Sequence, residues 1–300
     1  MTDNPYLNEV HQTLPRVLSL FNTDPTSNTF GYGDRLFWSW KLTDFANGTF
    51  QGAVHGMSLL LKNNLLPARF DSNAMLKRID SIFIATEKIA RDNGSLEEAF
   101  PYEGSYCVTA LIVFDQLNAI YTLSDFIDAS TQDRYLKTVG KMVEFLVKSD
   151  ETHAVITNHL ATAATALMLW SKKTGSPSAE KKALMLLERI KRNFCEEGWF
   201  NEYEGADPGY QSLGMYFLAS LMQFYSEPEL KKYLHKSCEF LSHFVHPDGS
   251  FGGLYGSRGT QLYYPAGFEI LGKNVPFARA IANYMSKSIK NKETVTLASV

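Results

Sequence analysis

Apolar residues recur at three- and four-residue steps in four long segments of the chain. These segments are 73–94, 133–150, 178–194 and 227–245, and each carries Lys, Arg and Glu opposite its apolar side. This periodicity is typical of an amphipathic α-helix with one side against a core and the other in water. Gly94 ends the first segment, which predicts a helix C-cap at that residue.

Four further segments are apolar almost all round. They cover 49–64, 104–121, 157–173 and 208–225, contain few charges and are rich in small residues. A helix without a polar face is buried on all sides. The two kinds of segment alternate along the chain, and strand signals between them are sparse. The pattern therefore predicts an all-α protein built from helical hairpins.

Polar residues at the start of the apolar segments are almost evenly spaced. The successive steps are 55, 53, 52 and 52 residues, between Gln51, Tyr106, His159, Gln211 and Tyr263. A repeat of this length, with one amphipathic and one buried helix in each unit, indicates a stacked array of helical hairpins. The buried inner helices favour an α/α toroid of five to six hairpins, as a closed or incomplete ring. An open solenoid of the HEAT or TPR kind is the alternative.

The composition is that of an ordinary folded protein, and we expect one α/α-toroid domain over residues 1–300. Hydrophobic residues make up 45% and charged residues 20%, which excludes disorder, and the net charge of -3 disfavours nucleic acid as a partner. The three cysteines have no CxxC spacing, so neither a zinc site nor a disulfide framework is expected. Nucleotide-binding and metalloprotease motifs are absent from the sequence, and we expect no cofactor and no metal.

The first residues, MTDNPYLNEVHQTLPRVLSLF, include early acidic residues and no basic segment before an apolar core. No signal peptide is therefore expected. Apolar runs do not reach the roughly 18 residues that a membrane span needs. These features favour a cytoplasmic protein without a membrane span, and nothing in the sequence assigns an oligomeric state.

The loops that precede the apolar helices are rich in aromatic and polar residues. In a ring of hairpins such loops gather at one end of the axis, which predicts a single concave site with aromatic walls and titratable groups. Aromatic rings with a polar atom suit sugars because one face is apolar while the polar atom stays wet. The residues that we expect to bind substrate there are Trp38, Trp40, Gln51, His55, Tyr102, Tyr106, Trp199, Glu202, Glu204, Gln211 and Tyr264.

Some candidates also have a structural interpretation. His55 lies inside a predicted buried helix, where a hydrogen-bonded core histidine is as plausible as a functional one. Asp207 directly precedes a proline at a predicted helix start, so it is a candidate N-cap. A functional role is favoured for Asn158 and His159, which share a helix start, and for Arg258, which lies in a glycine-rich loop.

Two segments resemble a known group of proteins. TNHLATAATALMLW is similar to the Asn-His inner-helix motif of the heparinase II/III and alginate lyase toroids, and ADPGYQSLGMYFL to their acid-Gly-Tyr-Gln-x-x-x-x-Tyr segment. Glycine-aromatic loops such as PDGSFGGLYGSRG recur across α/α-toroid enzymes, including glycoside hydrolases and terpene cyclases. The architectural resemblance covers nearly the whole chain. We expect the chain to lack the C-terminal β-sandwich of those lyases.

This resemblance implies an enzyme that cleaves an acidic poly- or oligosaccharide by β-elimination at a uronate. The reaction needs a group that neutralises the uronate carboxylate, a base for the C5 proton and an acid for the leaving oxygen. Asn158 and Arg258 are candidates to neutralise the carboxylate. His159 or Tyr210 is the candidate base, and Tyr210 or Tyr263 the candidate acid.

Two other functions are compatible with the same ring. A glycoside hydrolase would use two carboxylates, for which Glu103 and Asp207 are the candidates. A non-catalytic glycan-binding protein of surface-polysaccharide synthesis would use the aromatic residues alone. A terpene cyclase is disfavoured because the sequence contains no DxDD motif.

Overall fold

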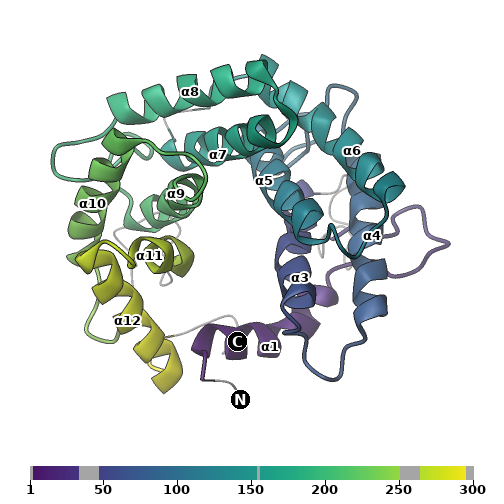
Figure 1. Cartoon of the computed structure of the whole chain (residues 1–300), viewed down its shortest axis with the longest axis horizontal. Coiled ribbons are helices and arrows are strands. Elements are labelled where there is room, and N and C mark those ends of the chain that lie inside the picture. Colours follow the sequence, from purple (N-terminus) through teal and green to yellow (C-terminus); the bar gives the residue numbers. More distant parts are fainter. Residues whose placement is uncertain (1–2, 34–46, 154–155, 251–263, 295–300) are drawn as a thin grey trace. The chain divides into compact units, whose positions relative to one another are not determined.

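The computed structural model describes residues 3–33, 47–153, 156–250 and 264–294. Within these ranges the chain forms α-helices, one short 3₁₀-helix and only isolated β-bridges, so the all-α prediction is confirmed there (Figure 1). The helices are α1 (Pro5–Leu18), η1 (Gly48–Gly52), α3 (Ala53–Lys62), α4 (Ser72–Ile89), α5 (Tyr106–Thr122), α6 (Ala129–Lys148), α7 (Thr157–Thr174), α8 (Pro177–Arg192), α9 (Pro208–Leu221), α10 (Pro228–Ser242), α11 (Pro265–Leu271) and α12 (Pro276–Asn291).

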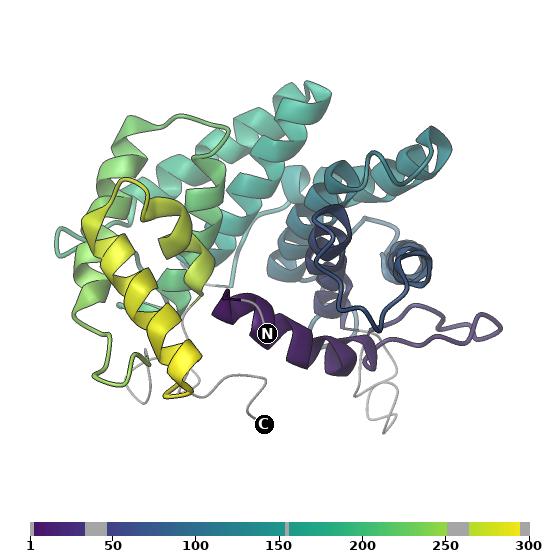
Figure 2. The same ribbon diagram turned by 60° about the horizontal axis from the view of Figure 1, so that its bottom comes forward.

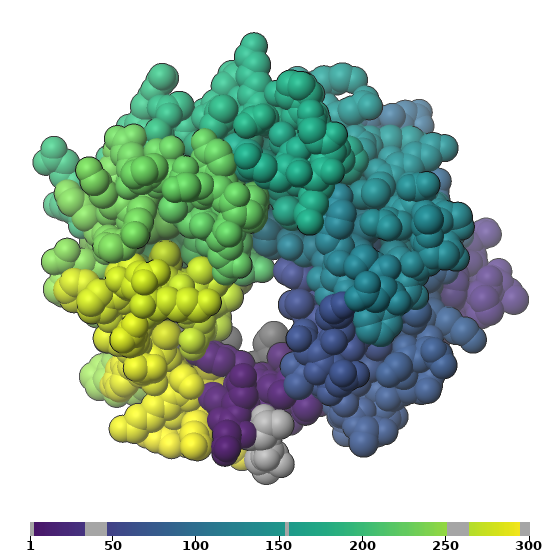
Figure 3. Space-filling model, viewed as in Figure 1, coloured from purple at the N-terminus to yellow at the C-terminus, as the bar shows by residue number. Residues whose placement is uncertain are grey.

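The chain divides into two compact units. Unit 1 comprises Met1–Gln12, Glu151–Met168 and Glu180–Val300, and unit 2 comprises Thr13–Asp150 and Leu169–Ala179. In unit 2, α5 packs against both α3 and α6, and α4 packs against α3. In unit 1, α11 packs against α9 and α12, and α12 also packs against α10. Figure 2 shows α12 in yellow beside the green helices of unit 1, and Figure 3 shows their side chains in direct contact.

The helices are of the two kinds that the sequence predicts. In α5, eleven of 17 residues are buried, whereas α6 buries six of 20. α5 is therefore surrounded by protein, and α6 presents one face to water. Ser105 caps α5 and Asp128 caps α6, each by accepting a backbone N–H of the first turn. Among the described helices, none combines the length and apolar character needed to cross a lipid bilayer.

The predicted end of α4 is wrong. The helix stops at Ile89, and Gly94 lies beyond it in a turn with φ of +89°. A Cβ atom at Gly94 would lie 2.2 Å from the backbone oxygen of Lys141 in α6. Glycine is needed here because the turn packs directly on α6, and not because it caps a helix.

Two other turns have the same construction. Gly198, with φ of +105°, lies against the backbone oxygen of Lys236 in α10, and Gly249, with φ of +81°, lies against Ser288 in α12. Each of the three glycine N–H groups donates to the carbonyl three residues earlier. Gly94 precedes α5 and Gly198 precedes α9, and several candidate residues lie between each of these turns and the helix that follows it.

Candidate functional site

Hydrogen bonds tie the start of α7 to the segment before α9 in unit 1. The N–H and the hydroxyl of Thr157 both donate to the backbone oxygen of Asn201, at 3.2 and 2.7 Å. The backbone N–H of Asn158 donates to Oε1 of Glu202, and its Nδ2 donates to Oε2, both at 2.8 Å. The N–H groups that open α7 are therefore satisfied by a carbonyl and a carboxyl group of one neighbouring segment.

Glu202 is an interior carboxyl group, only 3% exposed. Burial raises its pKa to about 8, repulsion from Asp207 acts in the same direction, and the hydrogen bonds from Asn158 oppose both. Glu202 thus lies beneath the surface and supports the first turn of α7, and its contact with substrate stays a prediction.

His159 forms a pair with Glu151, a residue that the sequence analysis did not select. Nδ1 of His159 lies 2.7 Å from Oε2 of Glu151, whose other carboxylate oxygen accepts the backbone N–H of His153 at 2.9 Å. Burial disfavours ionisation of Glu151, but the bonds from His159 and His153 outweigh it, and its pKa is lowered. Arg189 donates from both Nη atoms to the backbone oxygen of Glu151, at 3.5 and 3.4 Å.

The His159 side chain keeps 16% of its surface exposed, whereas that of Glu151 keeps 6%. The imidazole is thus the accessible member of the pair. Glu151 lies eight residues before His159, in the loop that leads into α7. An acidic residue in the loop before a helix-start histidine was the available signal, but sequence spacing does not show which way the loop folds.

The start of α9 holds Asp207 and Tyr210. Asp207 is 5% exposed and accepts the backbone N–H of Tyr210 at 2.9 Å, so the prediction that it is an N-cap is confirmed. The ring of Tyr210, which is half-buried, lies 5.8 Å from that of Tyr203. Tyr203 and Glu204 are exposed and have positive φ of 53° and 72°. Non-glycine residues in this conformation are uncommon, and they are enriched at functional sites.

Gln51 and Gln211 have structural roles. Both are 1% exposed. Nε2 of Gln51 donates to backbone oxygens of Gly31 and Ile82, and Nε2 of Gln211 donates to that of Gly198. The amides hold glycine turns against the apolar helices. Oε1 of Gln51 accepts the backbone N–H of Gly33, whereas Oε1 of Gln211 has no hydrogen-bond partner among the described residues, and substrate binding by the two side chains stays a prediction.

The remaining candidates of unit 1 lie nearer to solvent. Nε1 of Trp199 donates to Glu197 at 3.0 Å, and Tyr264 is 44% exposed, with its backbone N–H donating to Oγ of Ser212. Four further predictions fall outside the described residues, on Trp38, Trp40, Arg258 and Tyr263.

Unit 2 contains a second histidine–carboxylate pair. Nδ1 of His55 in α3 lies 3.1 Å from Oδ1 of Asp115 in α5. The two side chains are 18% and 27% exposed. Burial raises the pKa of Asp115, and the hydrogen bond from His55 opposes that effect. This contact gives His55 a carboxylate partner within unit 2, and it is compatible with the structural and with the functional interpretation of His55.

The other described candidates of unit 2 differ in exposure and in hydrogen bonding. Tyr102 is 82% exposed, whereas Tyr106 is 6% exposed and its ring contacts Phe145. Oε1 of Glu103 accepts the backbone N–H groups of residues 98, 99 and 100. Glu103 thus holds a loop together, as Asp207 caps a helix. The two carboxylates of the predicted hydrolase pair both serve the backbone, and they belong to different units.

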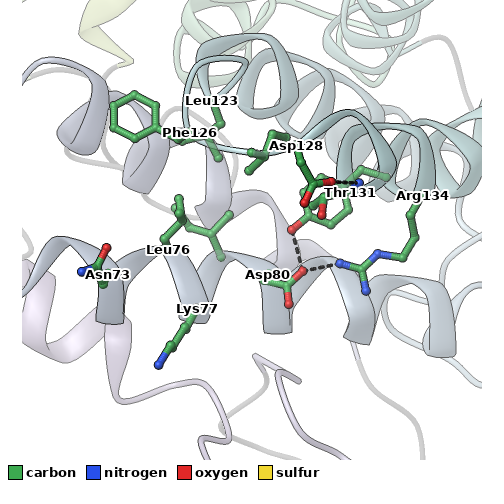
Figure 4. Close-up of a pocket in the computed structure, with 12 residues that line it drawn as sticks. Asn73, Leu76, Lys77, Asp80, Leu123, Phe126, Asp128, Thr131 and Arg134 are labelled. Carbon is green, nitrogen blue, oxygen red and sulfur yellow. Dashed lines mark hydrogen bonds and ion pairs between the residues drawn. The ribbon is translucent and has the colours of Figure 1, made fainter.

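A cavity of about 510 Å³ also lies in unit 2, between α4, α6 and the turn before α6 (Figure 4). Asp80 accepts hydrogen bonds from the hydroxyl of Tyr135 and the guanidinium of Arg134. Burial and the bond to Asp80 raise the pKa of Tyr135. These groups form hydrogen bonds with one another, and a tyrosine with a raised pKa stays protonated at neutral pH and is not available as a base. No residue selected from the sequence lines this cavity.

Within the described ranges, no group of three or more His, Cys, Asp or Glu side chains is arranged to hold a metal ion.

No protein-family model and no curated protein matches the sequence. Among solved structures, a glycosyl hydrolase of family 88 from Bacteroides vulgatus superimposes with a TM-score of 0.64 and 10% identity, over 99% of this chain and 88% of that one. A sugar epimerase from a ruminal bacterium gives 0.62 and 11%, over 95% and 86%. A polysaccharide lyase gives 0.60 and 10%, over 98% and 85%.

An inactive variant of an α-1,6-mannanase from Salegentibacter, with two aspartates replaced by asparagine and α-1,6-mannotriose bound, is also similar. Its TM-score is 0.53 at 15% identity, over 80% of this chain and 70% of that one. The chain has the α/α-toroid fold. Identities of 10–15% establish the fold alone, and the specific resemblance to the heparinase II/III and alginate lyase toroids stays a prediction.

Proposed function

We propose that the chain is a carbohydrate-active enzyme in which His159 removes a proton from the sugar. The observation that carries this proposal is the 2.7 Å contact between His159 and Glu151. A carboxylate on Nδ1 fixes the tautomer of the ring and stabilises the imidazolium, which leaves Nε2 to act as the base. No described residue bonds to Nε2, and the ring retains exposed surface.

The proposed reaction is β-elimination at a uronate of an acidic oligo- or polysaccharide. His159 takes the C5 proton, the electron pair forms a C4–C5 double bond, and the C4–O bond breaks. Tyr210, half-buried at the start of α9, donates a proton to the leaving oxygen. Arg258 is the proposed partner of the uronate carboxylate, and Tyr263 the alternative acid. Support comes from the lyase-like motifs and from a polysaccharide lyase among the structural neighbours.

Asn158 receives a positioning role in this proposal. Its side chain is 2% exposed and is bonded to Glu202, so it is not placed to neutralise a substrate carboxylate directly. Asn158 and Glu202 instead anchor the first turn of α7, which carries His159. A shift of this turn would move the base relative to the sugar, and proton transfer is sensitive to such displacements.

A glycoside hydrolase is the alternative, because two of the structural neighbours are glycoside hydrolases. It has less support from the site. Glu103 and Asp207 hold backbone N–H groups, and neither carboxylate is free of that structural role. A non-catalytic glycan-binding protein would need neither the pair of His159 and Glu151 nor a proton donor.

The test is incubation of the full chain with alginate, polygalacturonate and hyaluronan while ultraviolet absorbance is recorded. Elimination gives a 4,5-unsaturated product that absorbs in the ultraviolet. His159→Gln and Glu151→Gln should each lower the rate by roughly 10²-fold or more. His153→Gln is the matched control, because this exposed side chain lies two residues from Glu151 and its backbone bond is retained.

The other functions give different results in the same experiment. New reducing ends without ultraviolet absorbance would indicate hydrolysis. Deuterium uptake from heavy water without chain cleavage would indicate epimerisation, which also needs a base. Binding of a polymer with none of these changes would indicate a glycan-binding protein and would refute His159 as a catalytic base.

A further inference from the structure

A cavity of about 300 Å³ lies in unit 1 at the C-terminal end of α9. α10 and the turn between α11 and α12 form its other walls, and Figure 1 shows these helices together. The cavity shares no residue with the candidate site, whose Asp207 and Tyr210 stand at the opposite end of α9. Its volume is at the lower end of the range for small-molecule sites.

The charged residues that line the cavity are all basic. Lys231 comes from α10 and Lys273 from the turn before α12, and His235 lies one turn beyond Lys231. No acidic residue lines it within the described part of the chain, although the net charge of the protein is -3. The carboxylates of the first turn of α10, Glu227 and Glu229, lie 3.6 and 3.1 Å from Lys191. The local charge is therefore opposite to that of the whole chain.

Neutral polar groups and an apolar wall complete the lining. Gln223, Ser226 and Asn274 add side chains that can donate hydrogen bonds, and Met222, Ile270 and Leu271 contribute apolar surface.

The turn that carries Lys273 is held rigidly. Arg279 donates from Nε to the backbone oxygen of Gly272 at 2.7 Å and from Nη2 to that of Lys273 at 3.0 Å. Lys273 and Asn274 also line a neighbouring cavity of about 370 Å³, together with Arg279. The basic surface thus extends across both sides of a turn whose backbone is bonded to Arg279 of α12.

We propose that the cavity between α9, α10 and the α11–α12 turn binds a small organic anion. The ammonium groups of Lys231 and Lys273 bind its phosphate or carboxylate, and its apolar part packs on Met222, Ile270 and Leu271. A lone inorganic ion would leave the apolar wall uncovered, and a neutral ligand would leave the basic groups unpaired. The proposal is independent of the reaction assigned to His159.

Isothermal titration calorimetry on the full chain tests the proposal with three ligands of one size. Phenyl phosphate and benzoate carry the two anionic groups, and benzyl alcohol is the neutral analogue. At least one anion should bind at least tenfold more tightly than benzyl alcohol. A preference for phenyl phosphate or for benzoate would identify the anionic group that the site takes.

The double variant Lys231→Gln/Lys273→Gln should weaken binding of the anion at least tenfold. Lys232→Gln is the control, because Lys232 is an exposed neighbour on α10 that does not line the cavity. His159→Gln should bind the anion normally, which separates this site from the proposed catalytic one. Absence of binding for both anions, or equal weakening by the double variant and by Lys232→Gln, would overturn the proposal.

Discussion

Asn158 donates two hydrogen bonds to Glu202, one from its backbone and one from its side chain, and each measures 2.8 Å. The carboxyl group that accepts them is almost completely buried, and its pKa is about 8. The contact joins the helix that carries His159 to the segment that precedes α9. Since the acceptor titrates near neutral pH, the strength of this contact depends on pH.

Protein stability should fall as the pH rises from about 4.5 to about 8. The ordinary pKa of a glutamic acid is 4.5, so in this window the folded protein keeps a proton that the unfolded chain has lost. The shift from 4.5 to about 8 corresponds to at most about 5 kcal/mol. Urea denaturation of the wild type at pH 5, 6, 7 and 8 measures the slope of the free energy of unfolding against pH.

Glu202→Gln should remove most of that slope, because glutamine does not titrate. It should also cost about 1–2 kcal/mol at pH 5, since its amide has only one oxygen for the two donors of Asn158. Glu204→Gln is the control, because Glu204 is exposed and its removal should leave the slope unchanged. An unchanged slope in Glu202→Gln would show that Glu202 is not the titrating group.

Glu151 should have the opposite effect at acid pH. His159 and the backbone of His153 lower the pKa of Glu151. The stability that Glu151 contributes is therefore present above its ordinary pKa of 4.5 and is lost as the pH falls through its pKa in the folded protein. Glu151→Gln should flatten the stability profile below pH 4.5, and Glu151→Ala should also cost about 1–3 kcal/mol. Thermal melts between pH 3 and 6 check this, and Asp150→Asn, next to Glu151 in the sequence, is the control.

Helix positions could be predicted from the sequence because burial imposes a periodicity. The predicted segment 208–225 contains α9, and 157–173 coincides with α7 to within one residue. Pro5–Leu18 was not identified as a helix, because Pro15 lies inside it and only Leu14 and Leu18 are buried. A helix with so narrow a buried face gives a weak periodic signal.

The candidate site was predictable only in part. Asn158 and His159 stand at a helix start, where a short motif is informative. Their partners depend on how loops fold, and sequence spacing does not encode the contact of His159 with Glu151. For the same reason, the sequence does not show that the amides of Gln51 and Gln211 bond to backbone oxygens.

The glycine turns give a test of packing. Gly94→Ala should cost at least about 3 kcal/mol, because it combines a positive φ with a Cβ atom 2.2 Å from the backbone of Lys141. Gly175→Ala is the matched control, since Gly175 also has a positive φ, of +75°, but no atom lies within 4 Å of its added Cβ. It should cost about 1–2 kcal/mol. Equal losses in chemical denaturation would mean that the turn does not press on α6.

Asp207 distinguishes the proposed lyase from a hydrolase. Asp207→Asn keeps an N-cap of similar quality, so α9 should persist with little loss of stability, whereas Asp207→Ala should cost about 1 kcal/mol. The asparagine variant also removes a negative charge that raises the pKa of Glu202. The fall in stability with rising pH should therefore end at a lower pH than in the wild type.

The activity of the same variants completes the test. If Asp207 only caps a helix, Asp207→Asn should retain most of the rate of β-elimination, because the pair of His159 and Glu151 is untouched. If Asp207 is one of two catalytic carboxylates of a hydrolase, the rate of hydrolysis should fall by roughly 10³-fold or more in Asp207→Asn while stability is preserved. Ultraviolet absorbance and reducing ends are measured in parallel, with denaturation curves on the same samples. A lyase gives both signals and keeps them in Asp207→Asn, whereas a hydrolase gives reducing ends alone and loses them in Asp207→Asn.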